Sequence, residues 1–253
     1  MPNDKIMNTL EEIRRDIIIY QAPEYLDKEF LKELNINSID KKKLKDYGDD
    51  LSSIWDAYQK VLKYPLFFKE FYPNSKKITD FEALEHHIHA YLEDMIILKN
   101  KMILFLGKFR NGLVKVAKNK KEVKEFLNAG ITKTEETFDK VSKSRNPHHH
   151  KGSKFIDVNV LKAQNSYGAI SIIEEGFSKG WIRPDKKEEI KEKIKKNGTD
   201  AFEKARDNWI EVSIKNNEQI SGFINAMFKV IRPNLNQFLN IKPINDIIKS
   251  QQK

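Results

Sequence analysis

Apolar residues recur every three or four positions along most of this chain, which is the spacing of one face of an α-helix. The longest such run extends from Thr79 to about Phe109, and its apolar positions are Phe81, Leu84, Ile88, Tyr91, Leu92, Met95, Leu98, Met102 and Phe105. Thr79 followed by Glu82 has the form of a capping box, so we expect the helix to begin there. Gly112 follows its expected end.

Shorter runs, bounded by helix-starting and helix-ending residues, predict further helices on both sides. Their expected ranges are 8–20, 27–34, 51–62, 120–144, 158–177, 185–196, 199–231 and 243–250. We expect breaks near Gly48 and Pro65, an interruption around Gly130, a stop at Asn197-Gly198 and another at Pro233. Because the sequence contains no alternating apolar runs joined by a hairpin turn, we predict an all-α, multi-helix bundle.

The predicted helices fall into two regions. Residues 1–75 contain short helices and are expected to form an N-terminal helical extension that packs on the bundle, while residues 76–253 are expected to form the bundle itself. An aromatic cluster near the end of the extension is expected to close the core, and its members are Phe67, Phe68, Phe71 and Tyr72.

Composition and charge narrow the classes of function. The net charge of +9 slightly favours an acidic partner such as RNA, although a Lys-, Asn- and Ile-rich composition explains much of it. The chain has no cysteine, which excludes disulfides, thiolate metal sites and cysteine nucleophiles. Its apolar runs are too short to span a membrane, and the polar N-terminal residues do not resemble a signal peptide. We therefore expect a cytoplasmic protein with no membrane partner.

All six histidines lie in two clusters. His86, His87 and His89 belong to the long helix that starts near Thr79, and His148, His149 and His150 follow the next predicted helix. Consecutive helices in a bundle usually run antiparallel, so the start of the first lies beside the end of the second. The two clusters are therefore expected to be neighbours in space.

The second cluster belongs to the stretch Arg145-Asn146-Pro147-His148-His149-His150. Pro147 disfavours helical geometry at Asn146, so the preceding helix should end by Arg145, and Asn146 is a natural N-cap for a new turn. Arg145 and His150 would then converge on one anion near the N–H groups of a helix start. An arginine that clamps a phosphate and a histidine that transfers a proton are what a phosphodiester-cleaving site needs.

This stretch resembles the Arg-(four to six residues)-His signature of the HEPN superfamily, in its common form Arg-Asn-x-x-x-His, with Arg145, Asn146 and His150 in the motif positions. The likeness covers roughly residues 78–231. It implies a helical bundle of HEPN type and a metal-independent endoribonuclease of toxin, anti-phage or RNA-processing systems, which cuts RNA by attack of the 2′-hydroxyl. It also implies a homodimer whose two motifs share one cleft, no cofactor, and a cognate antitoxin or inhibitor protein as a candidate partner.

The resemblance also assigns roles to individual residues. Arg145 would hold and neutralise the scissile phosphate, Asn146 would orient the site, and His150 would act as general acid or base. His149 is the alternative to His150, because the spacing in the motif is loose. His89 and Glu93 are candidate supporting residues that would line the same cleft.

Other interpretations of these residues remain open. Arg145 and the histidines can form a simple helix-end cap, and a HEPN-like module can bind RNA, nucleotide or protein without catalysis. Both histidine clusters, with Glu93, can instead hold a metal in a hydrolase. His86, His87 and His89 can simply form a polar helix face. Arg110-Asn111 repeats the Arg-Asn pair without a suitably placed histidine, so we interpret it as a surface helix end.

Overall fold

The structure, a computed structural model, describes residues 9–27, 30–31, 34, 38–74, 77–143, 157–181 and 183–251. Regular elements in these residues are helices, which confirms the all-α prediction. The α-helices are α1 (Thr9–Gln21), α3 (Lys41–Leu62), α4 (Tyr64–Glu70), α5 (Asp80–Val116), α6 (Lys120–Thr137), α8 (Val158–Ser178), α9 (Lys187–Leu239) and α10 (Ile244–Gln251). Within the described residues, no helix has the length and apolar character needed to cross a membrane.

The chain divides into two compact units. The first contains residues 1–60, 95–139 and 218–253, and the second contains residues 61–94 and 140–217. Each unit therefore draws on segments from both sides of residue 75, and the predicted division of the chain into an extension and a bundle stays a prediction.

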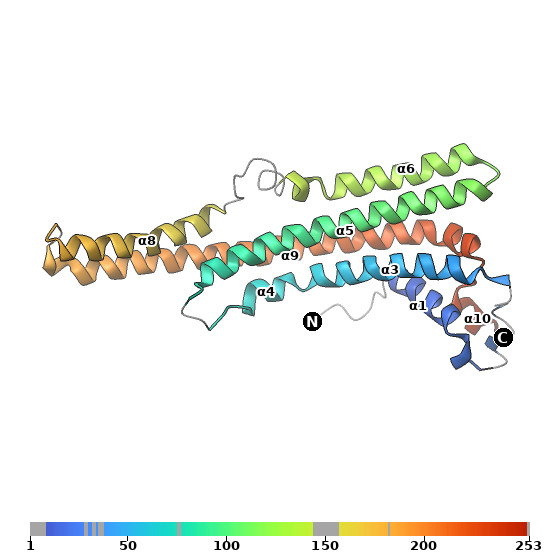
Figure 1. Cartoon of the computed structure of the whole chain (residues 1–253), viewed down its shortest axis with the longest axis horizontal. Coiled ribbons are helices and arrows are strands. Elements are labelled where there is room, and N and C mark those ends of the chain that lie inside the picture. Colours follow the sequence, from blue (N-terminus) through green and yellow to red (C-terminus); the bar gives the residue numbers. More distant parts are fainter. Residues whose placement is uncertain are drawn as a thin grey trace. The chain divides into compact units, whose positions relative to one another are not determined.

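In the first unit, aromatic rings hold α3, α5 and α9 together. Tyr47 of α3 packs edge-on against Phe105 and Phe109 of α5 and against Phe238 of α9. Figure 1 shows α6 lying along the second half of α5, where the Arg110 Nη1 atom donates to Asn128 Oδ1 at 2.6 Å. This contact and the turn between the two helices make α5 and α6 antiparallel, as expected.

In the same unit a group of charged side chains lies between α1 and α9. Arg232 of α9 pairs with Glu12 and, at 2.9 Å, with Asp16, whose side chain is almost fully buried. Burial raises the pKa of the Asp16 carboxyl, while the Arg232 guanidinium acts in the opposite direction. Thr9 at the start of α1 also donates to Asn225 Oδ1, so α1 is tied to α9 along its length.

In the second unit, α4, α8 and the first parts of α5 and α9 pack around aromatic side chains. Phe68 and Tyr91 are fully buried and their rings lie 5.9 Å apart, with Trp209 of α9 in contact with both. The predicted aromatic cluster is thus part of a core, although Phe71 at its edge remains exposed. Figure 1 shows α8 lying along the first part of α9.

Two glycines that we expected to mark helix ends lie inside helices. α3 begins at Lys41, ten residues before the expected start, and passes through Gly48. α5 begins after Thr79, whose capping box with Glu82 forms as predicted, but it continues through Gly112 to Val116. At both positions a neighbouring side chain occupies the space of a Cβ atom, so the missing side chain serves close packing rather than a helix end.

The predictions for the C-terminal half were wrong where they divided one helix into several. α9 runs without a break from Lys187 to Leu239, through both Asn197-Gly198 and Pro233. Gly198 lies against Ser166 and Tyr167 of α8, and Leu235 and Leu239 beyond the proline are buried. At Pro233, burial of Ile231 and Leu235 outweighs the local preference to end a helix, and at Gly198 the helix packs closely against α8.

The remaining helix boundaries follow the sequence more closely. α1, α8 and α10 agree with their expected ranges to within two residues. α6 is not interrupted at Gly130; the turn comes at Phe138, which is fully buried, and residues 139–143 are again helical. The helix expected over 27–34 lies partly outside the described residues.

Candidate functional site

The motif residues Arg145, Asn146, His149 and His150 lie outside the described residues, as do Pro147 and His148. The described chain reaches Lys143 in a helical segment and begins again at Asp157, directly before α8. The geometry of the motif residues therefore stays a prediction. The surroundings of Asp157 are described, and they belong to the second unit.

Asp157 fixes the start of α8 through both carboxylate oxygens. Its Oδ1 atom accepts from the backbone N–H groups of Asn159 and Val160 at 2.8 and 3.2 Å, which makes it the N-cap. Its Oδ2 atom accepts from the indole N–H of Trp209 at 3.0 Å. One side chain therefore both caps α8 and ties it to α9, only seven positions after His150.

The supporting candidates His89 and Glu93 lie on one face of α5. Together with Glu85 they are spaced four residues apart, and all three side chains are half-buried. The His89 Nε2 atom lies 3.9 Å from Glu85 Oε1, so a protonated His89 forms an ion pair with it. Gln164 of α8 donates to the other oxygen of Glu85 at 3.1 Å, which shows that this face is turned towards α8.

The contacts between α5 and α8 fix an antiparallel register. Phe81 packs against Tyr167, at 5.3 Å between ring centroids, and Glu85 binds Gln164. Both helices rise by the same amount per residue, so continuing the register places His89 beside the first turn of α8. By the same count Glu93 lies one to two residues beyond the level of Asp157. The predicted supporting residues therefore lie along the approach to the start of α8.

Hydrogen bonds between buried polar side chains also lie at this part of α5. The Tyr64 hydroxyl donates to Asp94 Oδ2 at 2.5 Å, and Asn216 of α9 donates to the Tyr91 hydroxyl at 3.1 Å. Burial raises the pKa of Tyr91 to about 12 and also raises that of Tyr64, so both hydroxyls stay protonated at neutral pH. They act as hydrogen-bonding groups that fix the position of residues 91–94.

The first histidine cluster does not act as one unit. His86 is exposed, whereas the His87 Nε2 atom lies 2.6 Å from the Phe71 carbonyl oxygen and its ring stacks near Phe67. In the described part of the chain, no three His, Asp or Glu side chains are close enough to hold a metal ion. The metal hypothesis needs His148 to His150, which lie outside that part, and it stays a prediction.

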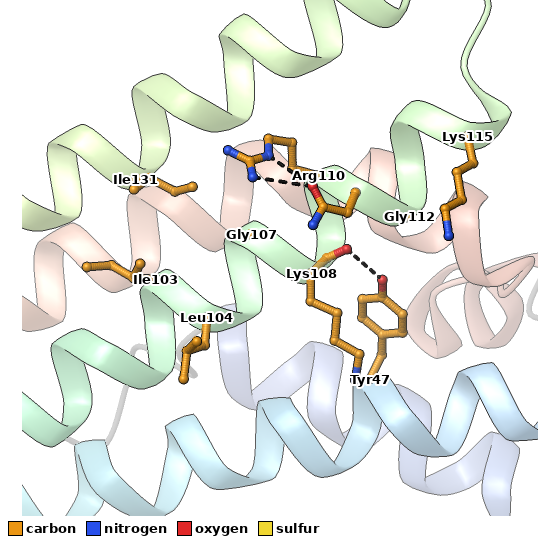
Figure 2. A pocket seen from close by; sticks show the side chains of 10 residues that line it. Tyr47, Ile103, Leu104, Gly107, Lys108, Arg110, Gly112, Lys115 and Ile131 are labelled. Atoms are coloured by element: carbon orange, nitrogen blue, oxygen red, sulfur yellow. Dashed lines mark hydrogen bonds between the residues drawn. The ribbon is translucent and has the colours of Figure 1, made fainter.

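A pocket in the first unit was missed by sequence reasoning. Arg110-Asn111 does not end a helix, because α5 continues to Val116, and Arg110 is half-buried against α6. Arg110 and Asn111 line a pocket of about 660 Å³ (Figure 2) together with Tyr47, Ile103, Leu104, Gly107, Lys108, Gly112, Lys115 and Ile131. The sequence feature that could have indicated this pocket is the antiparallel pairing of the two consecutive helices α5 and α6, which brings Asn128 beside Arg110.

Near Asp157, His89 and the carboxylates of Glu85 and Glu93 are groups that can position and transfer protons, whereas holding the phosphate needs a cation. That part of the chemistry falls to Arg145 in the sequence prediction. No protein-family model, curated protein or solved structure matches this chain.

Proposed function

We propose that this protein is a metal-independent RNA endonuclease of HEPN type. The observation that carries the proposal is the stretch Arg145-Asn146-x-x-x-His150 in an all-helical chain. The helical residues 139–143 precede the stretch and α8 follows it, which agrees with a motif placed after a long helix.

The surroundings of Asp157 add support from the chain itself. The sequence predicts His89 and Glu93 as supporting residues, and the register of α5 against α8 brings His89 beside the first turn of the helix that follows the motif. Asp157 and Trp209 hold that helix start firmly. A positioned general acid–base site needs such a rigid support.

In the proposed reaction, the 2′-hydroxyl of one nucleotide attacks the adjacent phosphorus and the bond to the 5′-oxygen of the next nucleotide breaks. The products are a 2′,3′-cyclic phosphate and a 5′-hydroxyl. Arg145 stabilises the negative charge that builds on the phosphate oxygens. His150 transfers the proton, Asn146 orients the site, and His149 is the alternative proton carrier.

The proposal includes partners and a location. RNA is the substrate, consistent with the net charge of +9, and the active form is a homodimer with both motifs in one cleft. A cognate antitoxin or inhibitor protein would keep the activity in check. The protein would act in the cytoplasm, where RNA is abundant.

The test is cleavage of mixed single-stranded RNA by the purified full chain, with and without EDTA. We expect cleavage to survive EDTA, to leave 2′,3′-cyclic phosphate ends and to spare DNA, which lacks the 2′-hydroxyl. Arg145→Ala and His150→Ala should each lower the rate by about 100-fold or more, the usual contribution of a phosphate clamp or a general acid–base. His149→Ala, tested beside them, identifies the proton carrier.

Arg183→Ala is the matched control, because Arg183 is exposed and pairs only locally with Asp185. It removes one arginine from the same unit and should cleave RNA at the wild-type rate. Activity that disappears with EDTA would contradict the proposal and favour a metal-dependent hydrolase. A folded dimer that binds RNA without cutting it would point to a binding module.

A further inference from the structure

The guanidinium group of Arg110 is held in position by hydrogen bonds to neutral side chains. Its Nη1 atom donates to Asn128 Oδ1 at 2.6 Å, and its Nε and Nη2 atoms donate to Asn111 Oδ1, each at 3.3 Å. In the described part of the chain no carboxylate pairs with it, whereas Arg183 pairs with one carboxylate and Arg232 with two. Of its five N–H donors, one on each terminal nitrogen remains available.

The rest of the pocket also carries positive charge without an acidic lining residue. Lys115 lies four residues after Asn111 on the same face of α5, is exposed, and has no partner among the described residues. Lys108 is different, since its Nζ atom is bound to Asp50 at 2.6 Å and to the Asp46 carbonyl oxygen. Arg110 and Lys115 are therefore the cations with capacity for a ligand.

Beside these cations the pocket has an apolar surface. Ile103 and Leu104 of α5 and Ile131 of α6 line it, and Leu104 is 71% exposed. Gly107 lies among them with no atom within 4 Å of the place where a Cβ would be, so the helix surface is open there. In Figure 2, Arg110 points from α5 towards α6, while Lys108 and Tyr47 lie on the α3 side.

We infer that this pocket binds a nucleoside phosphate, either free or as one unit of an RNA strand. The phosphate lies against Arg110, with the free amide N–H₂ of Asn111 and the flexible Lys115 as further donors. The planar base lies over Gly107, between Leu104 and Ile131. A volume of about 660 Å³ is in the range of sites for small ligands.

The pocket shares no residue with the motif at 145–150, so this inference goes beyond the proposed nuclease and can hold or fail without it. A mononucleotide contains no phosphodiester bond to cleave. Its binding can therefore be measured whether or not the protein cuts RNA, and variants of the pocket residues show whether it binds in the pocket.

The experiment titrates the full-length wild-type chain by calorimetry with AMP, adenosine, ribose 5-phosphate, inorganic phosphate and a short single-stranded RNA. We expect AMP to bind at least tenfold more tightly than adenosine, which lacks the anion, and than ribose 5-phosphate, which lacks the base. Tight binding of the RNA that the pocket variants weaken, together with weak binding of AMP, would identify the ligand as a unit of a strand. If neither binds, the inference is wrong.

Three variants connect binding to the pocket. Lys115→Ala removes a side chain with no described partner, and Gly107→Leu fills the space above the helix, so both should fold and should weaken binding at least fivefold. Arg110→Lys keeps the charge but loses the planar fork, with a similar expected loss. Lys121→Ala removes a charge of α6 that pairs only with Glu125, and should bind as the wild type does. Equal affinity of all the variants would overturn the inference.

Discussion

At the scale of single residues, two glycines of the same helix have opposite surroundings. A Cβ atom at Gly107 would meet nothing within 4 Å, whereas at Gly112 it would lie 2.7 Å from Phe238 Cζ and 2.8 Å from the Tyr47 hydroxyl. Both residues are in the interior of α5, where glycine is a poor helix former. Of these two glycines, only Gly112 lies where close packing leaves no room for a larger side chain.

We therefore predict effects of opposite sign for the same substitution. Gly107→Ala should stabilise the protein by roughly 0.5–1 kcal/mol, because alanine loses less backbone entropy in a helix. Gly112→Ala should destabilise it by about 1–3 kcal/mol, the usual cost of overpacking a well-packed core. Urea unfolding followed by circular dichroism measures both, and a gain in stability at Gly112 would contradict the packing argument.

At the scale of secondary-structure elements, the start of α8 links the fold to the proposed site. α8 has antiparallel contacts with both α5 and α9: Gln164 binds Glu85, and Glu174 accepts from Lys191 at 2.8 Å. Asp157 caps the helix and accepts from Trp209 at the end nearest the motif. The position of this end is therefore set by tertiary contacts as well as by the cap.

Asp157→Ala should lower the free energy of unfolding by about 1–2 kcal/mol, because the helix loses its N-cap. Asp157→Asn keeps a capping oxygen and loses the partner of the Trp209 indole, so its loss should be smaller. If the proposed function is correct, RNA cleavage should fall in the same order. Equal stability of the alanine variant and the wild type would show that the cap is not needed.

At the scale of the whole molecule, the proposed function depends on association of two chains. A cleft that contains two motifs requires a dimer, so the activity per chain should fall when the protein is diluted below its dimer dissociation constant. Sedimentation velocity over the same concentrations should show the dimer give way to monomer. His150→Ala should sediment as the wild type does, since a histidine proposed for proton transfer is not needed for association. Full activity of a monomer would rule the dimeric cleft out.

The local pattern predicted those elements whose ends are set by local chemistry. The start of α5 follows from the Thr79–Glu82 capping box, and α8 and α10 begin and end near their expected positions. The prediction failed at Gly48, Gly112, Gly198 and Pro233, which are helix breakers in an isolated chain. The three glycines pack against segments that are distant in sequence, and buried side chains flank Pro233 on both sides.

The sequence alone determined that the chain is helical, because apolar residues spaced by three and four favour a buried helix face over a strand. It also singled out Arg145 and His150, since a motif of residue types needs no coordinates. Only the tertiary structure decided that Glu85 faces α8, and that Arg110 lies in a pocket beside α6. The physical reason is that packing between segments far apart in the chain decides which helix covers a given face. The apolar periodicity within one helix does not identify that partner.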